Sequence, residues 1–147
     1  MFLLDTNVYI DSFNNPLLEE PFRAFHSRAL PRLVLSAVVA HELLVGARTQ
    51  DRRRALERGL LEPFRTRARV HVPTLSTWRL AAEIDRRLRD LKEYEASLAQ
   101  RGFGNDILIA ASAREIGATI VTRNVADFAR IGRVVPLRFE PPWPSGM

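Results

Sequence analysis

Short apolar segments alternate along this chain with longer segments whose apolar residues recur at helical spacing. The first apolar segment is hydrophobic on both faces of an extended chain, which is typical of a strand buried inside a parallel sheet. This alternation predicts an α/β fold, in which helices form layers around a mainly parallel sheet of four or five strands. The expected strands are residues 2–5, 33–35, 69–72, 119–122 and 133–137.

Polar residues and glycines mark the ends of the expected helices. Ser36 and Asn105 suit the N-cap position, because their side chains can accept hydrogen bonds from the free N–H groups of a first turn. Gly117 suits the end of a helix, since glycine adopts the left-handed conformation of a C-cap without steric cost. Apart from a helical turn after residue 5, the expected helices are 17–29, 37–46, 51–67, 75–99 and 106–116.

The length of 147 residues is enough for one compact domain with a substantial core. We expect residues 1–140 to form that domain. Residues 141–147 are expected to form a proline-rich tail, because prolines exclude helix and central strand there. No apolar run approaches the roughly 20 residues of a membrane span, and the first residues lack the basic region of a signal peptide. A cytoplasmic protein that does not associate with membranes is therefore expected.

The amino-acid composition excludes several kinds of catalytic and metal site. The chain has no cysteine, which excludes disulfides, zinc–thiolate sites and thiol catalysis. The net charge is +5, and all of the 22 basic residues except Lys92 are arginine. Arginine binds phosphate through paired hydrogen bonds, so this surface favours a polyanion such as RNA or DNA. Two alternatives stay open: a genome rich in G and C would also enrich arginine, and an acidic protein partner could cover the basic face.

Against this basic background, four carboxylates stand at the edges of apolar segments: Asp5, Glu42, Asp106 and Asp127. Asp5 ends the first expected strand, and Asp127 follows the strand expected at 119–122. The carboxyl ends of parallel strands meet at one edge of a sheet, where ligands of such folds bind. Carboxylates gathered there repel each other, and a hard cation such as Mg²⁺ or Mn²⁺ is the usual solution.

Each carboxylate also has an ordinary structural interpretation. Asp5 could cap the helical turn that follows it, and Asp106 could meet the positive end of a helix dipole. Glu42 could face solvent on an amphipathic helix, and Asp127 could be a turn residue. No one of the four therefore identifies a site by itself.

Four short motifs, taken together in their order and spacing, resemble the PIN domain and, more narrowly, the VapC toxins of bacterial toxin–antitoxin pairs. The resemblance covers about residues 2–137. The motifs are Leu4-Asp5-Thr6-Asn7, Ser36 through Glu42-Leu43, Asn105-Asp106 with Ile109-Ala110-Ala111, and Thr122-Arg123-Asn124-Val125-Ala126-Asp127-Phe128.

The resemblance implies an Mg²⁺- or Mn²⁺-dependent endoribonuclease with a doubly wound α/β/α fold. It places the catalytic and metal-binding pocket at Asp5, Glu42, Asp106 and Asp127. Many PIN domains carry an acid where this chain has Asn124, so Asp127 is expected to be the fourth carboxylate. The expected substrate contacts are Thr6, Thr122 and Asn124 at the rim of the pocket and Arg123 on a flanking phosphate.

The resemblance also implies partners. The substrate would be RNA, with an unstacked tRNA or rRNA loop as the expected target. The protein would form a homodimer and would be inhibited by a small VapB-like antitoxin whose tail enters the acidic groove. Helices 17–29 and 51–67 are expected to take part in these contacts. The second of them carries an apolar stripe of Leu56, Leu60, Leu61 and Phe64.

Two other functions remain open. The chain could be a non-catalytic nucleic-acid-binding or regulatory module in a DNA-bound complex with its antitoxin. It could also be a phosphatase-like hydrolase of small phosphate esters, although the arginine-rich surface favours a polymer. Phe103, which lies between two glycines, is expected to be a mobile aromatic residue at the groove edge.

Overall fold

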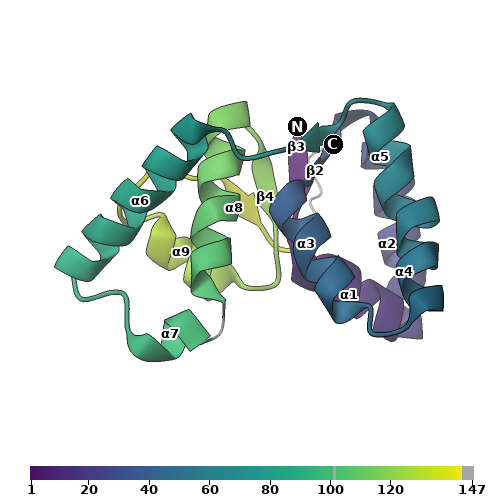
Figure 1. The fold of residues 1–147 in the computed structure, drawn as a ribbon, viewed down its shortest axis with the longest axis horizontal. Coiled ribbons are helices and arrows are strands. Elements are labelled where there is room, and N and C mark those ends of the chain that lie inside the picture. Colours follow the sequence, from purple (N-terminus) through teal and green to yellow (C-terminus); the bar gives the residue numbers. More distant parts are fainter. Residues whose placement is uncertain (101, 144–147) are drawn as a thin grey trace.

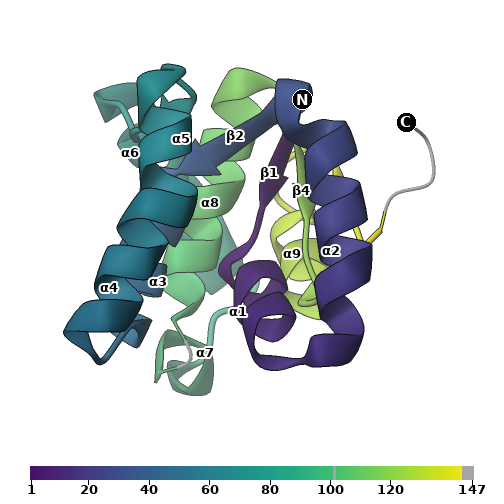
Figure 2. The same cartoon turned by 90° about the vertical axis from the view of Figure 1, so that its right-hand side faces the viewer.

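A five-stranded, fully parallel sheet with the strand order β3-β2-β1-β4-β5 forms the centre of the protein. The computed structural model describes residues 1–100 and 102–143. Helix α8 lies on one side of β1 and β4, and α2 lies on the other (Figures 1 and 2). The expected α/β fold with helical layers is confirmed. The strands are β1 (Phe2–Leu4), β2 (Leu33–Ser36), β3 (Val70–His71), β4 (Thr119–Val121) and β5 (Phe139–Glu140).

The central strand β1 sets the position of the candidate site. All three of its residues are buried, and Leu3 pairs with Val34 on one side and Ile120 on the other. The backbone N–H of Asp5 continues the β1–β4 ladder by donating to the Val121 carbonyl at 2.9 Å. The chain segments that leave β1 and β4 therefore start side by side at the same edge of the sheet.

The helices begin and end largely where the sequence predicts. The side chain of Ser36 accepts a hydrogen bond from Val38 N at 3.2 Å, and Gly117 ends its helix with a left-handed φ of 67°. The main helices are α1 (Thr6–Asn14), α2 (Pro16–Ala29), α3 (Ala37–Gly46), α4 (Gln50–Leu56), α5 (Glu62–Thr66), α6 (Leu75–Asp90), α7 (Ala96–Gln100), α8 (Phe103–Ile116) and α9 (Val125–Ile131). A 3₁₀ turn spans Leu30–Arg32, and a π-helical turn at Glu57–Leu61 joins α4 to α5.

The expected single helix over residues 75–99 is wrong. It divides into α6 and α7, because Lys92 adopts a positive φ of 56° and the chain leaves the helical path. The next residue, Glu93, is held by α9, since Arg130 donates to its backbone carbonyl at 3.0 Å and to its carboxylate at 3.2 Å. Arg133 forms a further ion pair with the same carboxylate.

Two further expectations about element ends are wrong. Residues 133–137 are not a strand: Val134 and Val135 are buried in a turn after α9, and pairing with β4 begins at Phe139. Asn105 is not the N-cap of its helix, because α8 starts two residues earlier, after Gly102 with its left-handed φ of 82°. This shift frees the Asn105 side chain for a contact inside the site.

The predicted apolar stripe of the 51–67 segment packs mostly on the protein itself. Leu60 and Phe64 are buried, while Leu56 and Leu61 are partly buried against the core. The predicted tail begins with residues that also contact this core, since the Trp143 ring lies 5.2 Å from the Phe25 ring. Residues 144–147 of that tail lie outside the described residues. No helix in the described part of the chain has both the length and the hydropathy that crossing a membrane requires.

Candidate metal-binding pocket

Asp5 is buried at the point where β1 passes into α1, with only 3% of its surface exposed. Its Oδ1 accepts a hydrogen bond from Thr6 N at 2.7 Å, so it does cap α1. Its Oδ2 accepts two more, from Asn7 Nδ2 and Thr122 Oγ1, each at 2.7 Å. Asp5 therefore caps α1 and also belongs to the candidate site.

Burial raises the pKa of Asp5, because removal from water penalises the charged form, and the nearby Glu42 charge raises this pKa further. The hydrogen bonds from Thr122, Thr6 and Asn7 oppose these effects but do not cancel them. A negative charge at this position is therefore stabilised only in part by the protein, and a cation beside it would complete that stabilisation.

Glu42 lies in the middle of α3 and is partly buried, so it does not simply face solvent. The Thr6 hydroxyl donates to its Oε2, and Asn105 Nδ2 donates to its Oε1 at 2.9 Å. Both oxygens therefore point inward, toward the ends of β1 and α8.

Asn124 joins the remaining two carboxylates. Its Nδ2 donates to Asp127 Oδ2 at 2.8 Å and to Asp106 Oδ2 at 3.3 Å. Its backbone N–H donates to Thr122 Oγ1 at 2.9 Å. Asp106 is in the first turn of α8, and Asp127, which is 6% exposed, is in the first turn of α9.

These bonds connect all four carboxylates in one network. Glu42 is linked through Thr6 to Asp5, and Asp5 is linked through Thr122 to Asn124, which reaches Asp106 and Asp127. The bond from Asn105 to Glu42 closes the network, because Asn105 precedes Asp106 in α8. The structure thus brings together the predicted Asp5, Glu42, Asp106 and Asp127 with Thr6, Thr122 and Asn124.

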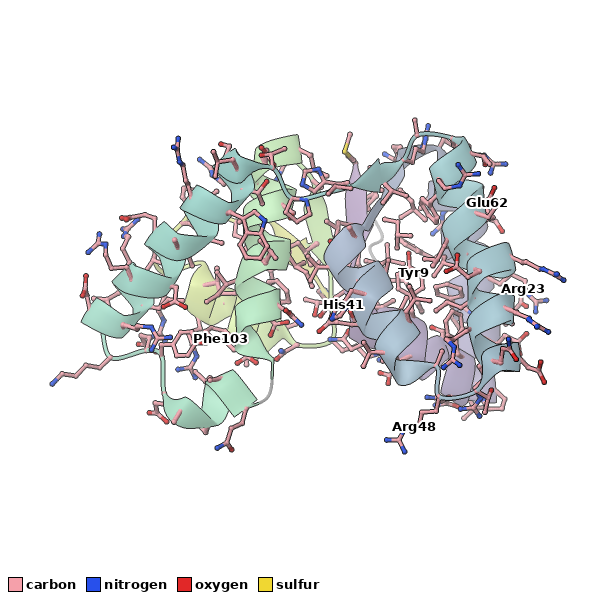
Figure 3. All side chains as sticks on the ribbon, in the orientation of Figure 1. Tyr9, Arg23, His41, Arg48, Glu62 and Phe103 are labelled. Carbon is pink, nitrogen blue, oxygen red and sulfur yellow. The ribbon has the colours of Figure 1, made fainter. Side chains whose placement is uncertain are left out.

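Three predicted residues have surroundings that the sequence does not indicate. Thr122 has no exposed surface, so its hydroxyl positions Asp5 and does not line an open rim. Arg123 turns toward α1, where its Nε pairs with Asp11 Oδ2 at 2.9 Å. Phe103 is not a mobile residue at the groove edge: it is 1% exposed, its ring lies 5.2 Å from that of Tyr94, and it sits between α6 and α8 (Figure 3).

Two residues of the network, Asn7 and Asn105, are not among the site residues expected from the sequence. Asn7 holds Asp5 through its Nδ2 and accepts a hydrogen bond from Arg123 N at 3.1 Å on its Oδ1. Asn105 holds Glu42. The only available signal was an amide adjacent to a carboxylate motif, and that signal does not distinguish a cap from a partner across the fold.

The residues present fit a hard divalent cation in their chemistry. All the candidate ligands are carboxylate, amide or hydroxyl oxygens, which Mg²⁺ and Mn²⁺ prefer. Within residues 1–100 and 102–143, however, no three His, Asp or Glu side chains already converge closely enough to hold an ion. Amide and hydroxyl groups of Thr6, Thr122, Asn105 and Asn124 bridge the carboxylates instead.

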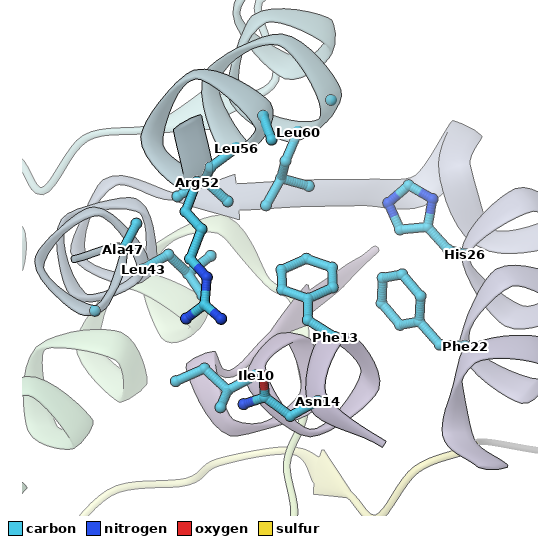
Figure 4. Close-up of a pocket in the computed structure, with 13 residues that line it drawn as sticks. Ile10, Phe13, Asn14, Phe22, His26, Leu43, Ala47, Arg52, Leu56 and Leu60 are labelled. Atoms are coloured by element: carbon cyan, nitrogen blue, oxygen red, sulfur yellow. The ribbon is translucent and has the colours of Figure 1, made fainter. Parts of the chain in front are cut away.

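An apolar cavity lies on another part of the molecule, with a volume of about 590 Å³. Its walls come from α1, α2, α3, α4 and the π-helical turn (Figure 4). Phe13 of α1 and Phe22 of α2 contact each other inside it, with ring centroids 6.1 Å apart. Phe13 is 56% exposed, so the cavity presents large apolar groups to solvent.

Comparison with known proteins assigns this geometry to a family. The PIN domain matches residues 2–134, which is nearly the whole chain. The chain belongs to the PIN-domain family. The resemblance expected from the four motifs is thereby confirmed. PIN domains are in general nucleases and generally use divalent metals, which agrees with the oxygen-rich pocket. No curated protein matches the chain significantly.

Several solved structures are similar to this PIN domain. DNA-bound VapBC from Salmonella typhimurium contains a chain that is 25% identical, with a TM-score of 0.72 over 95% of this chain and 96% of that chain. FitAcB from Neisseria gonorrhoeae gives 24% identity and a TM-score of 0.75 over 97% and 99%. VapBC-1 from nontypeable Haemophilus influenzae gives 24% identity and a TM-score of 0.68 over 95% and 96%. At 24% identity, the similarity to FitAcB and to VapBC-1 shows a shared fold.

Proposed function

We propose that this PIN domain is a metal-dependent endoribonuclease that acts as the toxin of a toxin–antitoxin pair. The observation that carries the proposal is the network in which Asp5, Glu42, Asp106 and Asp127 meet at the carboxyl edge of the sheet. Carboxylates from the end of β1 and from α3, α8 and α9 have no structural need to gather at one place. Their convergence is what an oxygen-liking cation and a phosphodiester would use.

The side chains have separate roles in this proposal. Asp5, Glu42, Asp106 and Asp127 would hold Mg²⁺ or Mn²⁺, which would supply positive charge to the scissile phosphate and lower the pKa of an attacking water. Glu42, which is only partly buried and directs both oxygens inward, would accept the proton of that water.

Thr6, Thr122 and Asn124 act on these carboxylates and fix their orientation. The ion pair of Arg123 with Asp11 leaves its guanidinium side chain 35% exposed, so it can still meet a flanking phosphate. Attack by water predicts products with a 5′-phosphate and a 3′-hydroxyl.

Asp5→Asn tests the catalytic proposal, with Asp51→Asn on the exposed face of α4 as the matched control. Partners one shell away from a metal typically affect activity by about 10- to 100-fold, so loss of a ligand should lower cleavage by about 100-fold or more. The assay compares RNA, DNA and a small phosphate ester at several Mn²⁺ concentrations. Cleavage by Asp5→Asn at the parent rate would reject the assigned ligands, and preferred cleavage of DNA or the ester would reject RNA as the substrate.

The apolar cavity supports the second part of the proposal, a small VapB-like antitoxin. Helices α2 and α4, in the segments where sequence analysis expects partner contacts, both line it. Apolar side chains of the antitoxin would fill the cavity, and a basic tail would reach the acidic pocket and pair with its carboxylates. Such a tail would compete directly with the cation.

Gly59→Leu tests the use of this cavity. A Cβ at Gly59, which lines the cavity, meets no atom within 4 Å, so a larger side chain starts into open space there. We expect co-expression with the product of the adjacent reading frame to give a complex for the parent and little or none for Gly59→Leu. Growth arrest by Gly59→Leu in the presence of that product would also support antitoxin binding in the cavity. An equally stable complex would place the antitoxin elsewhere.

A homodimer remains part of the proposal. Val72, Leu75 and Trp78 are 64%, 67% and 56% exposed around the start of α6, and exposed apolar groups of this size mark an interaction surface. Trp78→Asp should convert a dimer into a monomer, as measured by light scattering during size-exclusion chromatography. A parent protein that is monomeric at tens of micromolar would reject the dimer.

A second function is favoured by one similar structure. The Salmonella typhimurium complex, 25% identical in the matched chain, is described as DNA-bound. We therefore keep the proposal that this chain acts in a DNA-bound regulatory complex with its antitoxin. A gel-shift assay of the purified complex on its own promoter tests it, and Asp5→Asn should bind DNA as the parent does.

A further inference from the structure

Besides Asn14, two polar side chains line the mainly apolar cavity of α1, α2, α3 and α4. One is the guanidinium of Arg52, which points from α4 toward Ile10 and Asn14 (Figure 4). The other is the imidazole of His26 on α2. In the view of Figure 4, the rings of Phe13 and Phe22 lie between the two. Polar groups in an apolar site commonly fix the orientation of what binds there.

The charge of Arg52 is not neutralised within the described part of the protein. Several arginines on neighbouring surfaces do pair with acids, for example Arg65 with Glu62 at 2.6 Å and Arg23 with Glu19. No ion pair joins Arg52 to an acidic side chain among residues 1–100 and 102–143. A guanidinium beside apolar walls gains most from a carboxylate, which it can bind through two hydrogen bonds.

His26 offers a second unused group. Its Nε2 is buried and has no hydrogen-bond partner within the described residues, although the ring packs 5.3 Å from Phe22 and 6.1 Å from Phe64. Buried polar atoms are nearly always hydrogen-bonded in folded proteins. An occupant of the cavity that brings a hydroxyl or amide group to this nitrogen would supply the missing partner.

We propose that Arg52 and His26 determine which partner segment the cavity accepts: an apolar segment of the small antitoxin with a carboxylate facing Arg52 and a hydroxyl or amide facing His26. The inference rests on the proposed antitoxin. The inference adds which polar groups the antitoxin segment carries. It also adds the direction in which the segment lies, because Arg52 and His26 bind different groups at opposite sides of the cavity. Charge complementarity selects this occupant over a second copy of the chain, whose arginine-rich surface would meet Arg52 with like charge.

The test measures the affinity of the purified protein for the product of the adjacent reading frame, by biolayer interferometry. Arg52→Glu is compared with Arg54→Glu, which makes the same charge change at an exposed position of α4 that does not line the cavity. We expect Arg52→Glu to weaken binding by about tenfold or more and Arg54→Glu by less than about twofold. His26→Phe, which keeps an aromatic ring but removes the nitrogens, should weaken binding several-fold.

A charge swap then identifies the partner's carboxylate. Each Asp or Glu of the antitoxin is changed in turn to Lys, and one of these changes should restore binding to Arg52→Glu while weakening binding to the parent. Equal losses for Arg52→Glu and Arg54→Glu, or the absence of any rescuing position, would overturn the inference. Binding of a second copy of this chain at the cavity, seen as a dimer that Gly59→Leu abolishes, would overturn it as well.

The outcome is separable from the proposed function. A complex that forms but ignores Arg52 and His26 contradicts this inference alone. No complex with the parent contradicts the antitoxin proposal and this inference with it, whereas the Asp5-dependent cleavage of RNA is measured on the free protein and stands or falls separately.

Discussion

Asn124 shows how one side chain can set the electrostatics of the pocket. Its amide nitrogen lies between Asp106 and Asp127 and donates a hydrogen bond to each. An acid at this position would place a third carboxylate against two others, and mutual repulsion would then have to be relieved by a proton or a cation. The neutral amide therefore adds two hydrogen bonds and no further negative charge between these two carboxylates.

Asn124→Asp should make the folded protein more dependent on metal. Without metal, loss of two donated hydrogen bonds and the added repulsion should lower the free energy of unfolding by about 1–3 kcal/mol. With saturating Mn²⁺, the extra ligand should recover most of that loss. Thermal unfolding with EDTA and with Mn²⁺ measures both values. A variant as stable as the parent in EDTA would show that the Asn124 bonds contribute little.

At the scale of elements, the α6–α7 break depends on a contact with α9. Glu93 follows the positive-φ Lys92, and its carboxylate, 24% exposed, is bound by Arg130 and Arg133. These bonds span about 40 positions in the sequence, so the helix pattern of residues 75–99 carries no sign of them. The break positions Tyr94 against Phe103, at the start of the helix that carries Asp106.

Glu93→Gln should loosen this junction, and Asp90→Asn is its matched control. Both acids lie near the C-terminal end of α6, but Asp90 is 62% exposed, and among the described residues it forms an ion pair only with Arg86 of its own helix. Surface pairs within a helix contribute about 0.3–0.5 kcal/mol, whereas hydrogen bonds to a largely buried charge contribute about 1.5–3 kcal/mol. We expect faster hydrogen exchange at residues 91–100 in Glu93→Gln only. Similar exchange in both variants would mean that α9 does not anchor the break.

At the scale of the whole molecule, the end of β1 and the three helices α3, α8 and α9 bring the carboxylates to one place. In the folded protein, burial raises the pKa of Asp5, and the nearby Glu42 charge raises it further. Unfolding separates these groups. A cation that binds only when they are together must stabilise the entire fold, since no single element contains a complete set of ligands.

Mn²⁺ should therefore raise the melting temperature of the parent protein. A ligand at about a hundredfold excess over its Kd adds roughly 2.7 kcal/mol to the free energy of unfolding. NaCl at equal ionic strength should not reproduce the increase, and Asp5→Asn should respond weakly. If Mn²⁺ shifts the parent and Asp5→Asn by equal amounts, the ion binds outside the network.

The sequence by itself determined the features that depend on neighbouring residues or on a rule of the fold. Ser36 and Gly117 end helices through local backbone chemistry, so their caps were predictable. Asp5 and Asp127 follow strands of a parallel sheet, whose carboxyl ends share one edge. The tertiary structure alone decided the contacts between distant segments: Asn105 with Glu42, 63 positions apart, and the Arg130–Glu93 pair that divides a helix. These depend on the distance between elements after packing, a quantity that no periodicity within one element encodes.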